Sequence, residues 1–155
     1  MMKPRFTRKS IHTYSMNRLR VIERILIREL IAMAEEAVNI CRNLTPDDNS
    51  YTDQTGNLRS SIGFELFVNG VAYHEDFKAS GTGTESGETG MFKGKELAEE
   101  IGPLGAFTLI FVAGMDYAEE VEMRGKLVLT PGYDYIEKQM PKVLDKVKEL
   151  VARAA

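Results

Sequence analysis

The chain has 155 residues, of which 43% are hydrophobic and 28% are charged, with a net charge of −3. These values lie near the averages of folded proteins, so they exclude a disordered chain and favour one domain with a substantial core. The single cysteine excludes an internal disulfide, and no apolar run approaches the roughly 20 residues of a membrane-spanning helix. We therefore expect a soluble protein that is not exported.

Positive charge is concentrated at the N-terminus. Residues 1–20 contain six basic residues and no acidic one, which leaves 14 basic against 23 acidic residues in the rest of the chain. We interpret residues 1–16 as a basic arm and residues 17–155 as a single domain. The arm can contact nucleic-acid phosphates or an acidic patch on a neighbouring subunit, or it can be a terminus without a specific role. The candidate contact residues are Lys3, Arg5, Arg8 and Lys9.

A long amphipathic helix is predicted next. From about Asn17 to Leu44, apolar side chains recur every three or four residues, which is the spacing of one helical face. Asn17 can cap the start of this helix, and Pro46 prevents its continuation. Cys41 lies on the helix among apolar neighbours, so we expect a buried and inert thiol.

The segment 53–62 combines a turn with the start of a strand. Asp53 and Thr55 carry short oxygen side chains that can accept hydrogen bonds from nearby amides, and Gly56 can adopt the left-handed conformation. We expect Arg59 to point to water. Taken alone, the pattern is that of an ordinary turn that leads into a strand.

An antiparallel hairpin follows this turn. Apolar positions alternate with shorter or polar ones up to Val68, Asn69-Gly70 is typical of a two-residue hairpin turn, and Val71 begins the return strand. His74 falls near the end of the return strand. No second histidine or cysteine stands at ligand spacing, so we expect a surface or cross-strand residue rather than a metal ligand.

Residues 79–94 are rich in glycine and nearly free of apolar side chains, so we expect a flexible loop there. The glycine spacing fits neither the phosphate-binding loop of nucleotide-binding proteins nor the dinucleotide-binding pattern. Glu85 and Glu88 would also repel phosphate. We therefore expect no nucleotide at this loop.

The remaining sequence predicts several short elements and a final helix. The short elements are a helix at 95–101, a strand buried on both faces at 107–112, a helical turn or strand at 117–123 and a strand at 127–129. Asp134 can cap the final helix with Glu137 at the capping-box position, and its apolar face continues across Pro141, where we expect a kink. Together the elements predict an α+β domain, in which the long N-terminal helix and the C-terminal helix pack on a small, mainly antiparallel sheet.

The sequence contains little evidence of a catalytic or metal-binding site. Asp47, Asp48 and Asp53 suggest a calcium loop, but Tyr51 stands where a third oxygen ligand is needed and the twelfth position carries no acid. The neighbouring glutamates of residues 119–122 are typical of a solvated helix face. We expect no enzymatic activity, no cofactor and no metal.

Two segments, Asp53–Ile62 and Met115–Glu122, carry short motifs in a defined order. With the helix end at Leu44-Thr45-Pro46, they resemble the tail-completion proteins (neck, or head–tail connector proteins) of long-tailed bacteriophages and prophages. Residues 47–52 are an extension that the compact family pattern lacks, and residues 124–129 replace the Phe-Gly and Arg-Pro-Phe-Leu steps of the family. The residues that match the motifs are Thr55, Gly56, Leu58, Arg59, Ser61, Ile62, Tyr117, Ala118, Val121 and Glu122.

This resemblance implies a structural protein of the virion that acts without catalysis at the head–tail junction, in tail completion or as a neck ring. It implies other head–tail junction and tail proteins as partners, a homo-oligomeric ring of hexameric size, and assembly in the cytoplasm of the bacterial host. The alternative is a small nucleic-acid-binding module that uses the basic arm. A DNA-binding protein would lose affinity steeply as the salt concentration rises.

Overall fold

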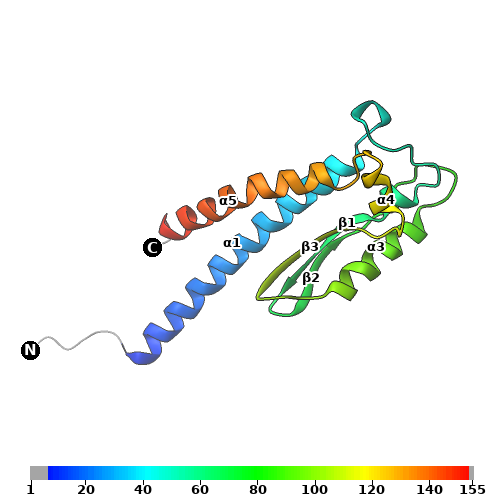
Figure 1. The fold of residues 1–155 in the computed structure, drawn as a ribbon. Helices are drawn as coiled ribbons and strands as arrows, with labels where there is room; N and C mark the ends of the chain where they lie inside the picture. The colour runs from blue at the N-terminus through cyan, green and yellow to red at the C-terminus, as the bar shows by residue number, and fades with distance from the viewer. Residues whose placement is uncertain (1–6, 154–155) are drawn as a thin grey trace, which may run out of the picture.

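The computed structural model describes residues 7–153 and contains helices on both faces of a small sheet (Figure 1). The elements are α1 (Arg8–Arg42), the 3-10 turn η1 (Pro46–Asp48), α2 (Asn57–Ser60), β1 (Ile62–Val68), β2 (Val71–Asp76), α3 (Glu88–Ile101), β3 (Phe107–Ala113), α4 (Ala118–Met123) and α5 (Thr130–Arg153). The described residues thus form an α+β fold with a long N-terminal helix, a C-terminal helix and an antiparallel sheet, and the predicted fold class is confirmed. Within residues 7–153, no helix combines the length and the apolar character that crossing a bilayer requires.

The sheet has three strands in the order β2-β1-β3, and both pairings are antiparallel. Asn69 and Gly70 join β1 to β2 with positive φ angles of 52° and 81°, as a primed two-residue turn requires. The predicted hairpin is therefore confirmed. All seven residues of β1 are buried, because this central strand is covered on both faces.

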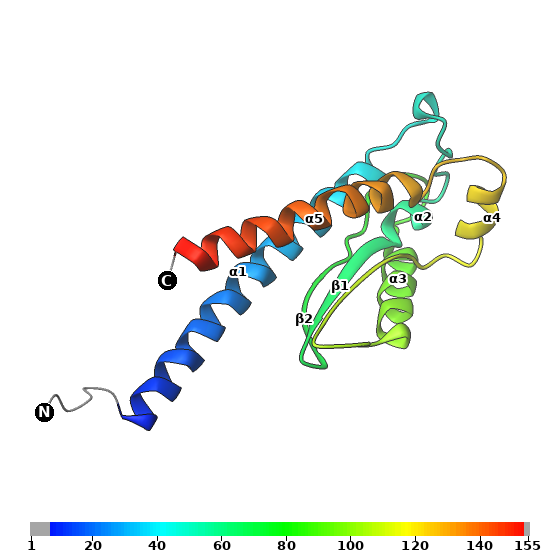
Figure 2. The same ribbon diagram turned by 60° about the vertical axis from the view of Figure 1, so that its left-hand side comes forward.

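One face of β1 packs against α1 and, through α1, against α5 (Figure 2). Phe64 of β1 contacts Ala34 and Val38 of α1. Further along the strand, Leu66 shares a cluster with apolar residues of α1 and with Val143 of α5. The apolar stripe of the long helix thus covers the sheet, as its periodicity indicated.

The opposite face of the sheet packs against α3. Ala98 of α3 lies among Phe67, Ile110 and Val112 of the sheet. Gly90 comes so close to α2 that an added Cβ atom would lie 1.9 Å from the carbonyl oxygen of Asn57. The glycines at this end of α3 therefore allow close packing. The expectation that the loop extends to residue 94 is wrong for this reason, since the helix begins at Glu88.

The first helix also begins earlier than expected. The hydroxyl of Thr7 accepts the amide N–H of Ser10 at 3.2 Å, and Ser10 Oγ accepts the amide N–H of Thr7 at 3.0 Å. This reciprocal capping box starts α1 at Arg8, so the expected start at Asn17 is wrong. Residues 8–16, which were expected to belong to a separate arm, are the first turns of α1. Lys3 and Arg5 lie outside the described residues.

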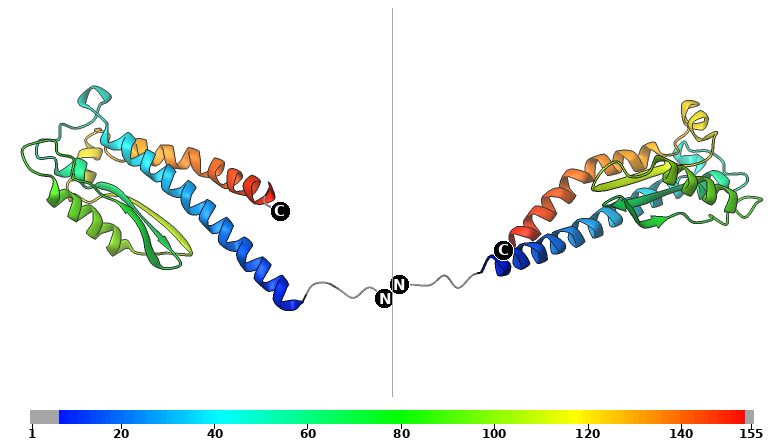
Figure 3. Two further views of the ribbon diagram at one scale, coloured as in Figure 1. Left: turned by 180° about the vertical axis from the view of Figure 1, so that it is seen from behind. Right: turned by 90° about the horizontal axis from the view of Figure 1, so that it is seen from below.

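The start of α1 projects beyond the rest of the molecule (Figures 1 and 3). The side chains become buried only from Ile27 onward, where α5 and the sheet begin to cover the helix. Earlier along the helix, Arg18 donates a hydrogen bond to the carbonyl oxygen of Val151 in α5 at 3.0 Å, the first hydrogen bond between the two helices along the described part of α1. Residues 8–17 therefore form an exposed helical extension.

Three expectations about the C-terminal half need correction. β3 is an edge strand that is buried on the face toward α3 and only partly buried on the face toward α1, where Leu109 and Phe111 pack, so full burial on both faces is not found. Leu127 makes an isolated bridge with Ser50 instead of starting a strand. Asp134 lies inside α5 and not at its cap, because α5 begins at Thr130; the helix then continues through Pro141 as one element.

Candidate functional site

The two motif segments meet at one end of the fold. Leu58 and Ile62 from the first segment share a hydrophobic cluster with Ala118 and Val121 from the second, and Cys41 of α1 belongs to the same cluster. Segments far apart in the sequence thus form a single packed unit, which we call the motif junction. It lies where α1 ends and α5 begins.

The turn of the first segment has the hydrogen bonds that its sequence predicts. Asp53 Oδ1 accepts the amide N–H of Gly56 at 3.1 Å, and Asp53 Oδ2 accepts that of Arg59 at 3.3 Å. Thr55 Oγ1 accepts the amide N–H of Asn57 at 3.2 Å. Gly56 has a φ angle of +83°, the left-handed conformation expected for it. The turn then continues into the short helix α2, which the turn-and-strand pattern of this segment does not predict.

Gly56 also allows the glycine-rich loop to lie directly on the turn. An added Cβ atom at Gly56 would lie 2.0 Å from the carbonyl oxygen of Thr82. The loop is fixed here by backbone hydrogen bonds from Thr84 to Gln54 at 2.8 Å and from Glu85 to Thr55 at 3.2 Å. The glycine of the motif thus serves both the turn and its contact with the loop.

Asn57 connects the turn to the start of α3. Its Oδ1 accepts the amide N–H of Gly90 at 3.2 Å, and its Nδ2 donates to the carboxylate of Glu85 at 2.6 Å. The first turn of a helix has amide N–H groups without partners inside the helix. Asn57 satisfies one of these groups and so fixes α3 against the motif junction.

Arg59 does not point to water as expected. Its Nη2 donates a hydrogen bond to the carbonyl oxygen of Leu44 at 2.9 Å, and its Nε lies 3.9 Å from Asp53 Oδ2. Leu44 follows the C-terminal end of α1, where carbonyl groups lack helical partners. The guanidinium supplies a donor to a carbonyl group that has no partner within the helix. Arg59 therefore fixes the end of α1 to the turn.

Glu122 has the corresponding role at the start of α5. Its Oε1 accepts the amide N–H groups of Val128, Leu129 and Thr130 at 3.3, 2.9 and 2.7 Å. Burial acts to raise the pKa of Glu122, but the hydrogen bonds from these amides lower it overall. A carboxylate at a helix N-terminus is also favoured by the helix dipole. The sequence signal for this cap is weak, because the acid lies on a different helix from the one it caps.

A small cleft opens at the surface of the motif junction. Its volume is about 200 Å³. The residues that line it are Tyr51, Thr52, Asp53, Gln54, Thr55, Leu58, Tyr117 and Val121. Burial raises the pKa of Tyr117, whereas a hydrogen bond with Thr55 acts to lower it. The cleft is smaller than the 300–1,000 Å³ or so of ordinary ligand pockets, and four of the motif residues, Thr55, Leu58, Tyr117 and Val121, form part of its walls.

Burial favours the neutral forms of two titratable groups of the motif junction. Burial raises the pKa of the Cys41 thiol to about 12 and that of the Tyr51 hydroxyl also to about 12. The thiol is fully buried, as expected. Over the described part of the chain, no group of three or more histidine, cysteine, aspartate or glutamate side chains is arranged to hold a metal ion. His74 lies opposite Leu66 in the sheet, as a cross-strand residue.

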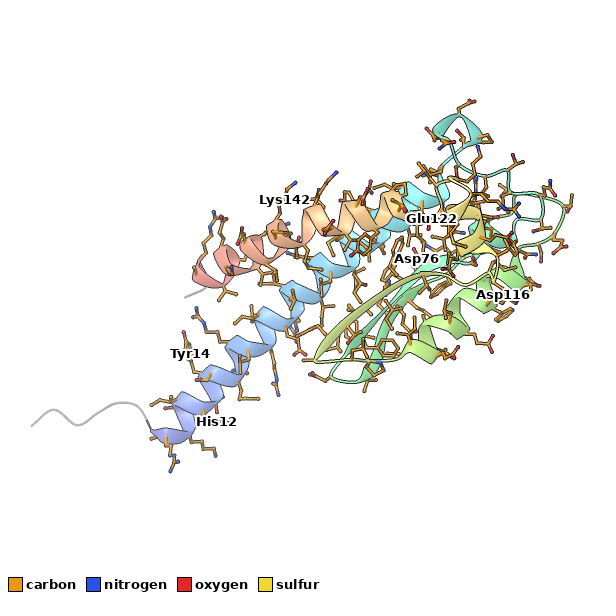
Figure 4. All side chains as sticks on the ribbon, viewed as in Figure 1. His12, Tyr14, Asp76, Asp116, Glu122 and Lys142 are labelled. Carbon is orange, nitrogen blue, oxygen red and sulfur yellow. The ribbon has the colours of Figure 1, made fainter. Side chains whose placement is uncertain are left out.

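The basic candidate residues lie at the other end of the molecule. Arg8 and Lys9 are exposed on the first turn of α1, close in sequence to His12 and Tyr14, which Figure 4 places on the projecting part of the helix, far from Glu122. The structure therefore brings the two motifs together but keeps the described basic residues apart from them. No protein-family model, curated protein or solved structure matches this chain.

Proposed function

We propose that this chain is a structural, non-catalytic subunit of a long-tailed bacteriophage or prophage, and that it acts at the head–tail junction as a tail-completion or neck protein. In this role, copies of the chain form a ring that contacts other head–tail junction and tail proteins. The proposal starts from the resemblance of the two motif segments, residues 53–62 and 115–122, to the tail-completion family.

The observation that carries the proposal is the way the motif junction fixes helix ends. Arg59 holds the end of α1 through Leu44, and Glu122 holds the start of α5 through Thr130. Both are motif residues, and both make structural contacts. The motif thus fits a protein whose motif residues hold its long helices in place, as in a structural subunit, rather than one whose motif residues transform a substrate.

The projecting part of α1 supports a role in assembly. Ile11 and Tyr14 are 56% and 61% exposed, and Leu19 is also exposed. Apolar side chains that remain exposed along a helix, beside basic ones, are typical of a surface that contacts another protein. A subunit that presents such a helix is suited to assembly with other chains.

The second candidate is a nucleic-acid-binding module. It is favoured by the charge at the start of α1, where Arg8, Lys9 and Arg20 are exposed and no acidic residue occurs before Glu23. Phosphate contacts by such a helix would make the affinity for DNA fall steeply with salt concentration. A filter-binding titration of the full chain with duplex DNA at several salt concentrations separates this candidate from a purely structural role.

Deletion of the gene from its phage or prophage tests the proposed function. Electron microscopy of the lysate should then show DNA-filled heads and separate tails, and expression of the wild-type chain from a plasmid should restore joined particles. A plasmid that carries a stop codon early in the gene is the matched control. Normal particles with joined tails after the deletion would end the head–tail proposal.

A further inference from the structure

A second surface feature lies on the face of the sheet that carries α3. A groove of about 460 Å³ runs between α3 and the edge strand β2. The residues that line it are Glu65, Ala72, Tyr73, His74, Glu75, Lys95 and Glu99. We call it the acidic groove, because its three carboxylates outnumber the ammonium group of Lys95. It is distinct from the motif junction.

Glu65 is the unusual residue of the acidic groove. It lies on the central strand β1, its side chain is 3% exposed, and its Oε2 has no hydrogen-bond partner among the described residues. A buried carboxylate without a partner is costly. Glu65 also lies directly opposite Glu75 in the β1–β2 ladder, a pairing of like charges that destabilises a sheet.

The cation of the groove, Lys95, forms an ion pair with Glu75 and not with Glu65. Lys95 Nζ lies 2.7 Å from Glu75 Oε1. Burial raises the pKa of Glu65, and the nearby Glu75 and Glu99 raise it further. The charged form of Glu65 is thus disfavoured because the groove does not compensate its charge. A guanidinium or ammonium group from outside would satisfy it.

The same chain carries an exposed helical segment with basic and apolar side chains, the helical extension of α1. Arg8, Ile11 and Tyr14 follow one another at intervals of three residues on the projecting part of α1, so they lie near one face of the helix. In the acidic groove, Tyr73 is 57% exposed and offers an apolar wall beside the carboxylates. Charge and apolar surface thus correspond between the helical extension and the groove.

The extension cannot reach the groove of its own chain. Glu23 of α1 accepts a hydrogen bond from Asn69 at the tip of the β1–β2 hairpin. From Glu23, the helix runs outward without interruption to Arg8, about 22 Å away at 1.5 Å per residue. It also lies on the opposite face of the sheet from α3 (Figure 2). The partner that can supply this helix is a second copy of the chain.

We propose that the helical extension of one copy, residues 8–17, docks in the acidic groove of the next copy and places the guanidinium of Arg8 beside Glu65. This contact joins two different surfaces, so it repeats from copy to copy and closes into a ring when the rotation allows. It rests on the proposed function in one respect, namely that copies of this chain contact one another. It requires neither the motif junction nor a phage.

Charge variants of the full-length chain test the contact by sedimentation velocity over a wide concentration range. The extension variant carries Arg8→Glu and Lys9→Glu, and the groove variant carries Glu65→Gln and Glu99→Lys. Each should lower the association constant by at least about tenfold relative to wild type. The matched controls change exposed charges outside both surfaces: Lys138→Glu with Lys142→Glu, and Glu100→Lys. Both controls should associate like wild type.

Mixing the two defective variants gives the sharper result. The extension variant keeps an intact groove, and the groove variant keeps an intact extension, so the mixture should form one-to-one dimers and nothing larger. Association of both variants at the wild-type level, or a mixture that remains monomeric, would overturn the inference. Circular dichroism of each variant verifies that it is folded.

Cross-linking tests the same contact when the association is too weak to be measured by sedimentation velocity. One population carries Thr13→Cys in the extension and the other carries Glu96→Cys beside the groove, and a short bis-maleimide should join them only when they are mixed. Cys41 is buried and does not interfere. A wild-type chain that stays monomeric, combined with no cross-link between the populations, contradicts the inference.

The contact and the proposed function can fail separately. If the contact does not form but gene deletion still separates heads from tails, the proposed function stands without this contact. If the contact forms but deletion leaves joined particles, the contact stands without the proposed function.

Discussion

The carboxylate of Glu122 accepts the amide N–H of Thr130 at 2.7 Å and thereby joins the second motif segment to the first residue of α5. Glu122 and Thr130 belong to different helices, so the hydrogen bond fixes how α4 and α5 meet. Together with Arg59 at the end of α1, it makes the motif junction a joint between the two longest helices. The motif residues are thus explained by structural contacts.

Replacement of Glu122 should loosen the start of α5. Glu122→Ala removes acceptor contacts to three backbone amides, and loss of a helix cap costs about 1–2 kcal/mol. We expect the free energy of unfolding to fall by this amount in urea titrations. Glu119→Ala, an exposed change on the same helix, is the matched control and should be near neutral. An equal loss in both variants would contradict the capping role.

The stability that Glu122 provides should depend on pH. Its pKa is lowered in the folded state, so its contribution is present above the ordinary value of 4.5 and is lost as the pH falls through the folded value. The difference in free energy of unfolding between wild type and Glu122→Gln should therefore shrink below about pH 4.5. Urea titrations at neutral and acidic pH measure it. A difference that grows as the pH falls would reverse the sign and reject this account.

Gly56 should tolerate alanine much less well than Gly81. Both have positive φ angles, of +83° and +65°, but an added Cβ atom meets Thr82 at Gly56 and open space at Gly81. The left-handed backbone alone costs about 1–2 kcal/mol for alanine. We expect Gly81→Ala to show this cost in thermal unfolding, and Gly56→Ala to lose at least about 3 kcal/mol in all. Equal losses would mean that the loop does not lie on the turn as described.

The elements that could be predicted from sequence are those with local signals. The hairpin follows from Asn69-Gly70, and the buried face of α1 follows from apolar spacing, because turn conformation and helical periodicity are set by neighbouring residues. The hydrogen bonds of Asp53 and Thr55 are local in the same sense, since their partners lie within six residues.

The features that could not be predicted depend on distant parts of the chain. The contact of Arg59 could not be predicted because its partner, the carbonyl of Leu44, lies 15 residues earlier in the chain. The glycines at the start of α3 indicated a loop, but they serve close packing against Asn57, which a local pattern does not reveal. The capping box of Thr7 and Ser10 was a local signal that lay within the stretch interpreted as a basic arm.

Cys41 should report on unfolding of the motif junction. Burial raises its pKa to about 12, so the folded protein holds almost no thiolate at pH 8 and should react very slowly with Ellman's reagent. In denaturant, the same thiol should react at the rate of an ordinary exposed cysteine. A Thr13→Cys variant, with its exposed second thiol, is the control and should release one equivalent at once. Rapid reaction of native Cys41 would show that the junction opens readily.

Glu65 gives a prediction in which stability and assembly move in opposite directions. Its pKa is raised by burial and by the neighbouring carboxylates, so at neutral pH the charged form opposes folding, and the folded state gains stability as the pH falls. Glu65→Gln should therefore raise the melting temperature at pH 7, by a few degrees for a domain of this size. The increase should shrink at acidic pH, where Glu65 of the wild type is protonated. Glu100→Gln, an exposed change on α3, should leave the melting temperature unchanged.

The same variant separates a role in assembly from a role in folding. If the more stable Glu65→Gln chain also associates less well than wild type, the carboxylate is kept for contact with another copy. A loss of both stability and association would show that Glu65 is needed for the fold itself.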